Sequence, residues 1–129
     1  MTLAVNAIVL AVKDFDRAKD FYGKGLGAEP IQDYPGFVMF RLGEGSSPLA
    51  IYNRETAAQE AGVPSEGSGY RAFSLHHLVS DRTEVDEIMA RAESAGATVV
   101  KPAEAAQWGG YFGYFADPDG NLWKVATNS

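Results

Sequence analysis

The feature that most constrains the fold is a pattern that occurs twice along the chain. Val12-Lys-Asp14 and Val79-Ser-Asp81 each join an apolar, strand-like run to a segment with helical periodicity, and they lie 67 positions apart. A second pair of landmarks, Gly27-Ala28 and Gly96-Ala97, lies 69 positions apart. A repeat of this length predicts one supersecondary unit present in two copies.

In the first copy, the residue pattern predicts a strand, a short helix and three further strands. Asp14 is a typical helix-capping residue, and Gly23 and Gly25 end the helix. Pro30 removes a hydrogen-bond donor from its strand and therefore favours the edge of a sheet. The expected strands are 4–12, 28–33, 37–42 and 49–52, and the last two form a hairpin.

The second copy repeats this order of elements. Ser80 or Asp81 caps a helix, Asp81 and Glu84 have the spacing of a capping box, and Gly96 closes the helix. The apolar residues at helical spacing are Val85, Ile88, Met89 and Ala92. The expected strands are 71–79, 97–101 and a closing hairpin at 108–125, whose turn is Asp117-Pro-Asp-Gly120.

The expected fold class is therefore α+β, with two tandem β-α-β-β-β modules in one domain. Module one is 1–52, module two is 70–129, and 53–69 is a connector in which 55–61 favours a short helix. A helix covers only one face of each sheet, so the other face needs a cover of its own. The two modules are expected to wrap these faces around a shared concave cleft that takes a ligand.

The composition excludes several functional classes. The chain has 129 residues, 46% of them hydrophobic, which fits one compact domain. Its net charge of −6 disfavours nucleic acid as a partner. No apolar run reaches the roughly 18 residues needed to cross a membrane, and the first residues lack the basic start of a signal peptide, so a cytoplasmic location is expected. The absence of cysteine excludes thiolate nucleophiles and cysteine-ligated zinc.

Three segments carry a resemblance to a known family. They are Asp20-Phe-Tyr-Gly-Lys-Gly-Leu-Gly27, Val79-Ser-Asp-Arg-Thr-Glu-Val-Asp86 and Gly113-Tyr-Phe-Ala-Asp-Pro-Asp-Gly-Asn-Leu-Trp123. In these segments the chain resembles the vicinal oxygen chelate superfamily, which includes glyoxalase, bleomycin-resistance proteins and extradiol dioxygenases. The resemblance covers nearly the whole chain and implies this fold and a homodimer. It does not by itself define a function, because one fold supports unrelated chemistries.

Metal-using members of that superfamily bind their ion with His, Gln or Glu at four positions that face the cleft. The resemblance matches these positions to Ala7, Ala50, Ser74 and Lys124. Two of these side chains cannot bind a metal, the serine is a weak ligand, and the ammonium group repels a cation. The family's metal site is therefore expected to be missing, and no cofactor is expected.

The two histidines do not replace that metal site. His76 and His77 are adjacent on a predicted strand, so their side chains point to opposite faces. Strand alternation places His76 on the cleft side, where it is a candidate for ligand contact or acid–base catalysis. The alternative is a partly solvated residue at the cleft rim. His77 is expected to be a hydrogen-bonded histidine in the core.

Aromatic residues and one lysine complete the candidate site. Tyr114 matches a cleft tyrosine of extradiol dioxygenases, and strand alternation adds Phe112 and Trp108 as its neighbours; the alternative is that these aromatics only pack the core. Lys124 is either a counter-charge for an anionic ligand or a side chain that reaches solvent. Tyr52 is a candidate for the cleft wall because it shares a strand face with Ala50.

Three functions remain open on this basis. The leading hypothesis is a metal-independent protein that binds a neutral or anionic, partly aromatic small molecule. The second is a lyase, isomerase or dioxygenase-type enzyme that uses His76, Tyr114 and Lys124, either in acid–base catalysis or around a metal shared across a dimer. The third is a structural or partner-binding module.

Overall fold

The computed structural model describes residues 5–61, 63–67, 71, 73–107 and 109–129. The chain divides into two compact units, residues 1–66 (unit 1) and residues 67–129 (unit 2). Each unit contains one four-stranded sheet, so the fold is of the predicted α+β class. The boundary between the units falls inside the predicted connector. No helix among the described residues is long and apolar enough to cross a membrane.

Unit 1 has the predicted order of elements. Its sheet order is β1-β4-β3-β2, with β1 parallel to β4 and the other pairs antiparallel. The elements are β1 (Ile8–Val12), α1 (Phe15–Asp20), a π-helical turn η1 (Phe21–Gly25), β2 (Glu29–Tyr34), β3 (Phe37–Arg41), β4 (Leu49–Asn53) and α2 (Arg54–Ala61). The helix-side core consists of Leu10, Val12, Ala18, Phe21, Val38, Phe40, Leu49 and Ile51, all of which are buried.

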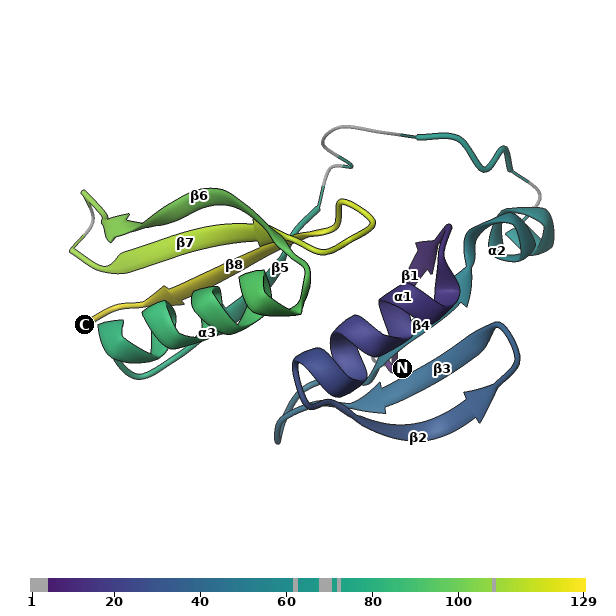
Figure 1. Ribbon diagram of the computed structural model, residues 1–129, viewed down its shortest axis with the longest axis horizontal. Coiled ribbons are helices and arrows are strands. Elements are labelled where there is room, and N and C mark those ends of the chain that lie inside the picture. The colour runs from purple at the N-terminus through teal and green to yellow at the C-terminus, as the bar shows by residue number, and fades with distance from the viewer. Residues whose placement is uncertain (1–4, 62, 68–70, 72, 108) are drawn as a thin grey trace, which may run out of the picture. The chain divides into compact units, whose positions relative to one another are not determined.

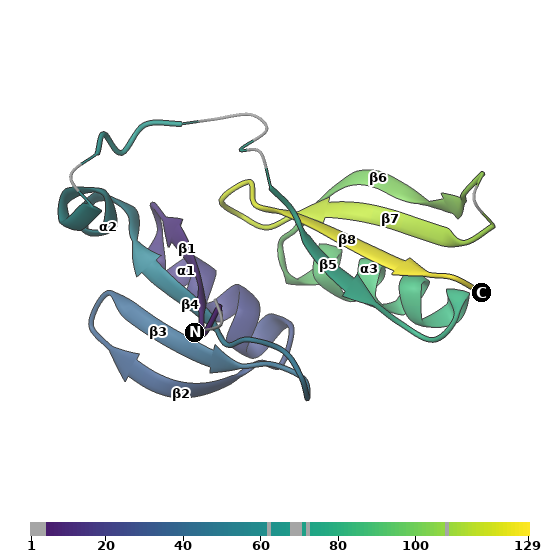
Figure 2. The ribbon, with the colours of Figure 1, turned by 180° about the vertical axis from the view of Figure 1, so that it is seen from behind.

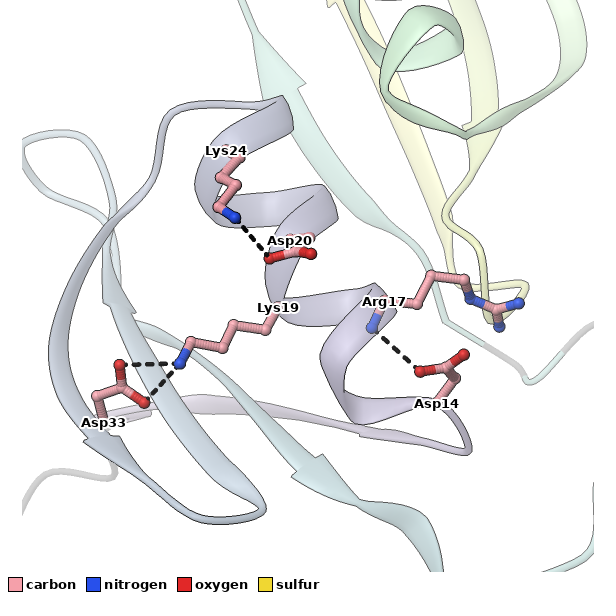
Figure 3. A network of polar contacts seen from close by, with 6 residues as sticks. All are labelled: Asp14, Arg17, Lys19, Asp20, Lys24 and Asp33. Atoms are coloured by element: carbon pink, nitrogen blue, oxygen red, sulfur yellow. Dashed lines mark hydrogen bonds and ion pairs between the residues drawn. The ribbon is translucent and has the colours of Figure 1, made fainter.

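Polar contacts fix α1 on this sheet (Figure 3). The Asp14 carboxylate accepts a hydrogen bond from the backbone N–H of Arg17 at 3.1 Å, which confirms Asp14 as the helix cap. The Lys19 ammonium group lies 2.8 Å from the Asp33 carboxylate, and this ion pair joins α1 to β2. The helix then continues through a π-helical turn as far as Gly25, one of the two predicted end points.

Unit 2 repeats the topology of unit 1. Its sheet order is β5-β8-β7-β6, again with one parallel pair, between β5 and β8. The elements are β5 (Leu75–Leu78), α3 (Arg82–Ala95), β6 (Thr98–Ala105), β7 (Tyr111–Ala116) and β8 (Leu122–Thr127). Within this unit α3 lies in front of the strands in Figure 1 and behind them in Figure 2, so the helix covers one face of the sheet.

The ends of α3 have the predicted chemistry. The Asp81 carboxylate accepts a hydrogen bond from the backbone N–H of Glu84 at 2.9 Å, and Gly96 ends the helix with a left-handed φ of 118°. Val85, Met89 and Ala92 are buried against the sheet, as their spacing predicts. A glycine is required opposite them, because a Cβ atom at Gly113 of β7 would lie 2.9 Å from the Met89 methyl carbon.

Several strand boundaries differ from the predicted ones. The first strands of the two units begin at Ile8 and Leu75, because pairing starts there, opposite Leu49 and Trp123. The strand predicted at 97–101 continues to Ala105 as β6, since β7 provides it with a partner that far. Two register shifts interrupt β6, and such irregularities are not visible as simple alternation.

Candidate functional site

The sheet of unit 2 has one face toward α3 and one face away from it, called here the helix-distal face. The hydroxyl of Tyr111 on β7 donates a hydrogen bond to Asp86 of α3 at 2.7 Å, and Gly113 also lies against the helix. Because strand side chains alternate between faces, Phe112 and Tyr114 lie on the helix-distal face. The resemblance predicts this face for Tyr114, and strand alternation predicts it for Phe112.

Three predicted site residues form one row across this face. Tyr114 of β7 lies directly opposite Lys124 of β8, and Lys124 lies opposite His76 of β5. Side chains of residues that face each other in a sheet project to the same side. The structure therefore brings His76 to Tyr114 and Lys124, which lie 38 and 48 positions after it in the sequence.

Close contacts tie the row to Phe112. The Lys124 Nζ atom lies 5.0 Å from the centroid of the Phe112 ring, within the range of a cation–π interaction. The rings of Phe112 and Tyr114 meet edge to face, with centroids 6.1 Å apart. The result is an aromatic surface that carries an ammonium group.

At the β5 end of the row, His76 is hydrogen-bonded to Ser74, the residue directly before β5. The hydroxyl oxygen of Ser74 and the Nε2 atom of His76 are 3.0 Å apart, which places both side chains on the same face. The side chain of His76 is exposed, so it is accessible from solvent. The Ser74 hydroxyl orients the imidazole ring and is itself engaged by it.

Lys101 of β6 extends the row, although the sequence reasoning did not select it. It lies opposite Tyr114, and its Nζ atom is 5.6 Å from the Phe112 ring centroid. The same ammonium group forms an ion pair with Glu104 at 2.6 Å. Only the register shifts of β6 show that Lys101 and Glu104 belong to this face, so sequence alternation could not assign them.

Tyr52 belongs to unit 1, where it lies opposite Phe37 on β3 and Ala11 on β1. Its hydroxyl donates a hydrogen bond to the Glu60 carboxylate of α2 at 2.8 Å. This hydrogen bond is the main cause that raises the pKa of Tyr52 above 10.0, with desolvation and the Glu60 charge adding to it. The Tyr52 hydroxyl is therefore already engaged within its own unit.

Unit 1 has a row at the place that corresponds to the row of unit 2. In it, Ala50 of β4 lies between Val9 of β1 and Met39 of β3. Lys124 is the counterpart of Ala50 in unit 2, and His76 and Tyr114 are the counterparts of Val9 and Met39. The polar side chains of the duplicated row are thus confined to unit 2.

The four positions matched to metal ligands do not have the donors that a metal ion needs. Ala7 and Ala50 carry no donor atom, and Ala50 is fully buried. The Ser74 hydroxyl is hydrogen-bonded to His76, and Lys124 is a cation. Within the described part of the chain, no group of three or more His, Asp or Glu residues could hold a metal ion. The donor set does not fit the superfamily's metal.

Two further predictions have different outcomes. Trp108 lies outside the described residues. The prediction that His77 is a core histidine is wrong, because its side chain is exposed. His77 lies opposite Val125 and so points to the helix side of the sheet, as predicted. However, β5 is an edge strand, and α3 contacts β6, β7 and β8, so this part of the sheet stays accessible.

A small hollow in unit 2 lies at the β7–β8 turn, away from the row. It is lined by Arg71, Phe73, Gly120, Asn121 and Leu122. The guanidinium group of Arg71 donates hydrogen bonds to the Asn121 side chain at 3.0 Å and to the carbonyl of Asp119 at 2.8 Å. These bonds attach the chain before β5 to the turn, which is a structural role.

Comparisons with known proteins agree with the fold. The model of the glyoxalase/bleomycin resistance protein/dioxygenase superfamily matches residues 4–125. The crystal structure of a glyoxalase-related enzyme from Fulvimarina pelagi is similar, with 32% sequence identity, a TM-score of 0.88, and 98% of this chain and 89% of that chain covered. An uncharacterized protein of Mycobacterium bovis is 31% identical over 90% of this chain and 78% of its own length.

A second solved structure supports the fold alone. A glyoxalase/bleomycin resistance protein/dioxygenase family enzyme from Burkholderia phytofirmans has a TM-score of 0.85 at 23% identity, with 96% of this chain and 98% of that chain covered.

Proposed function

This chain belongs to the glyoxalase/bleomycin resistance protein/dioxygenase superfamily, and we propose that it binds a neutral or anionic, partly aromatic small molecule without a metal ion. The binding surface is the helix-distal face of unit 2. Its contact residues are His76, Phe112, Tyr114 and Lys124, and Trp108 is added from the sequence. Tyr52, the remaining residue selected from the sequence, belongs to unit 1.

The observation that carries this proposal is the position of Lys124. It lies between His76 and Tyr114 at a position where metal-using relatives need a ligand, and its ammonium group lies 5.0 Å from the Phe112 ring centroid. An ammonium group repels a metal cation but attracts an anion or a carbonyl oxygen. Lys124 therefore favours direct binding of a ligand.

Aromatic residues beside Lys124 favour a ligand with an aromatic part. Phe112 and Tyr114 present two rings at right angles, and each ring offers a large, rigid apolar surface. The Tyr114 hydroxyl adds one hydrogen-bonding group at the same place. Small-molecule sites commonly combine apolar walls with a few polar groups of this kind. In the cytoplasm such a protein would sequester or sense its ligand, and a homodimer is the proposed assembly.

The test is a thermal-shift screen of neutral and anionic aromatic compounds, with the protein dialysed against a chelator. We expect at least one compound to raise the melting temperature, and added divalent metal to leave that increase unchanged. Phe112→Leu should reduce the increase. If no compound stabilises the chelated protein but compounds do so after metal is added, metal-independent binding is wrong.

A matched pair of variants locates the site on the proposed face. Tyr114→Phe and Tyr111→Phe each remove one hydroxyl from β7, but the two hydroxyls lie on opposite faces of the sheet. Tyr114→Phe should weaken binding, whereas Tyr111→Phe should leave it unchanged. Equal effects of the two changes would place the ligand elsewhere.

The row itself supports a second candidate function, an enzyme of the lyase, isomerase or dioxygenase kind. An imidazole, an ammonium group and a phenol side by side can exchange protons with a bound substrate. Turnover by chelated protein that His76→Gln abolishes would support acid–base catalysis. Stoichiometric metal that is lost on His76→Ala would instead support a metal shared across a dimer.

A further inference from the structure

We infer that the ligand of the proposed function carries an oxyanion, a carboxylate or a phosphate, on its aromatic part, and that Lys101 and Lys124 bind this group together beside Phe112. The inference rests on the proposed function, because it specifies the chemistry of the ligand at the same face. It adds Lys101 as a specificity-determining residue and assigns a separate role to Glu104.

The first observation is that two ammonium groups gather at one ring. The Nζ atoms of Lys124 and Lys101 both lie within 5.6 Å of the Phe112 ring centroid. They come from β8 and β6, on either side of β7, and each lies opposite Tyr114. An anion that packs against this ring is attracted by both ammonium groups.

The second observation concerns the charge balance of the face. Glu104 forms a 2.6 Å ion pair with Lys101. The residues opposite Lys124 are His76 and Tyr114, which carry an imidazole and a phenol. The chain as a whole has a net charge of −6, so two lysines together on this face are a local exception. An oxyanion complements the positive charge of these two lysines.

Glu104 then competes with the ligand for Lys101. The side chains of Lys101 and Glu104 are 43% and 58% exposed, so their ion pair is weak and can rearrange. When an oxyanion binds, Lys101 can exchange its ion pair with Glu104 for an ion pair with the ligand. Removing the charge of Glu104 should therefore increase affinity for an anionic ligand and leave affinity for a neutral one unchanged.

The phenyl ring beside the ammonium groups selects for an aromatic anion over a small inorganic one. The ring of Phe112 meets that of Tyr114 at a right angle, so a third ring can pack against the pair while its oxyanion reaches the lysines. Inorganic phosphate or acetate would gain the charge interaction but not the packing.

Isothermal titration calorimetry with three matched probes tests the inference: 2-naphthoate, 2-naphthyl phosphate and the neutral 2-naphthamide. We expect one of the two anions to bind about tenfold more tightly than the amide, as a charge-assisted hydrogen bond predicts. The tighter anion identifies the oxyanion as carboxylate or phosphate. Lys124→Met and Lys101→Met should each lower this preference, and Glu104→Gln should raise it.

The control is Lys24→Met, which removes the same charge from an 86% exposed side chain of unit 1. It should leave the preference unchanged. Circular dichroism shows whether each variant is folded, and Lys→Arg at each position, which keeps the charge, should retain the preference in a folded protein.

The outcomes separate this inference from the proposed function. If the amide binds as tightly as both anions and Phe112→Leu weakens it, the proposed function stands and the oxyanion inference is wrong. If the anions bind more tightly but neither lysine variant changes their affinity, the assignment of Lys101 and Lys124 is wrong. If no probe binds and the thermal-shift screen finds no ligand, the proposed function fails and the inference fails with it.

Discussion

Asn121 donates two hydrogen bonds to the carboxylate of Asp117, one from its backbone N–H at 2.8 Å and one from its side-chain amide at 2.9 Å. The same carboxylate accepts a third hydrogen bond from the backbone N–H of Asp119 at 2.9 Å. Both Asp117 and Asn121 are buried. Asp117 thus holds the turn that connects β7 to β8, and with it the strands that carry Tyr114 and Lys124.

Replacing Asp117 with alanine should lower the free energy of unfolding by about 2–4 kcal/mol, because two buried donors and one part-buried donor lose their acceptor. Urea denaturation followed by circular dichroism measures this change. The control is Asp20→Ala, which removes a 62% exposed carboxylate whose ion pair with Lys24 is long, at 3.8 Å, and should cost less than about 0.5 kcal/mol. Similar losses in the two variants would contradict the role of Asp117.

Gly113→Ala should destabilise the protein by about 1–3 kcal/mol, because the added methyl group overpacks the contact between β7 and α3. Its Cβ would lie 2.9 Å from the Met89 methyl carbon and 3.1 Å from two backbone atoms of β6. Thermal unfolding measures the effect. Gly43→Ala is the matched control, since a Cβ there has no neighbour within 4 Å. In the Gly113→Ala protein, the added change Met89→Ala should restore only part of the lost stability, because the contacts of the new methyl group with the two backbone atoms of β6 persist.

The two helix-capping aspartates, Asp81 and Asp14, should contribute unequally to the free energy of unfolding. Asp81→Ala should cost about 1 kcal/mol, because Asp81 caps the 14-residue helix α3. Asp81→Asn should retain most of that stability, since asparagine is an equally good cap. The corresponding change Asp14→Ala acts on the 6-residue α1, where the hydrogen bond is longer. Chemical denaturation measures the free energy of unfolding of each variant. Equal losses of stability in Asp81→Ala and Asp81→Asn would rule out a capping role for Asp81.

The pKa of Tyr52 should be above 10.0 and should fall when Glu60 is replaced by Gln. The main cause of the raised pKa is the hydrogen bond that the phenol donates to the Glu60 carboxylate. Because the folded state has the higher pKa, this bond contributes stability below pH 10, and the contribution is lost as the pH rises through the folded-state pKa. The ring-carbon NMR signals of labelled tyrosine report the ionisation. Glu44→Gln, a change in an exposed loop, should have no effect.

Much of the fold could be predicted because local signals repeat. Asp14 and Asp81 both cap helices, Gly96 ends one in the left-handed conformation, and the buried stripe of α3 has helical spacing. Strand alternation also predicts that His76 and Phe112 lie on the face to which the resemblance assigns Tyr114 and Lys124. These predictions depend on short-range geometry, which a sequence carries directly.

The failed prediction for His77, and the features that were not predicted, depend on contacts between distant residues. The exposure of His77 follows from the edge position of β5, which local alternation does not show. Lys101 and Glu104 reach the Phe112 face through irregular pairing of β6 with β7. Arg71 is attached to the β7–β8 turn by hydrogen bonds to residues nearly fifty positions away. Register and sheet order determine these features, and they emerge only when the strands assemble.

The duplicated row of unit 1 has the position of the unit 2 row but none of its polar side chains. Val9, Ala50 and Met39 occupy in unit 1 the places that His76, Lys124 and Tyr114 occupy in unit 2. The substitutions His76→Val, Lys124→Ala and Tyr114→Met would therefore give the row of unit 2 the side chains of the row of unit 1. Each of these side chains is already present at the corresponding position of the unit 1 sheet. The reverse exchange is not equivalent, because Ala50 is fully buried, and a polar side chain placed there would lose its contact with solvent.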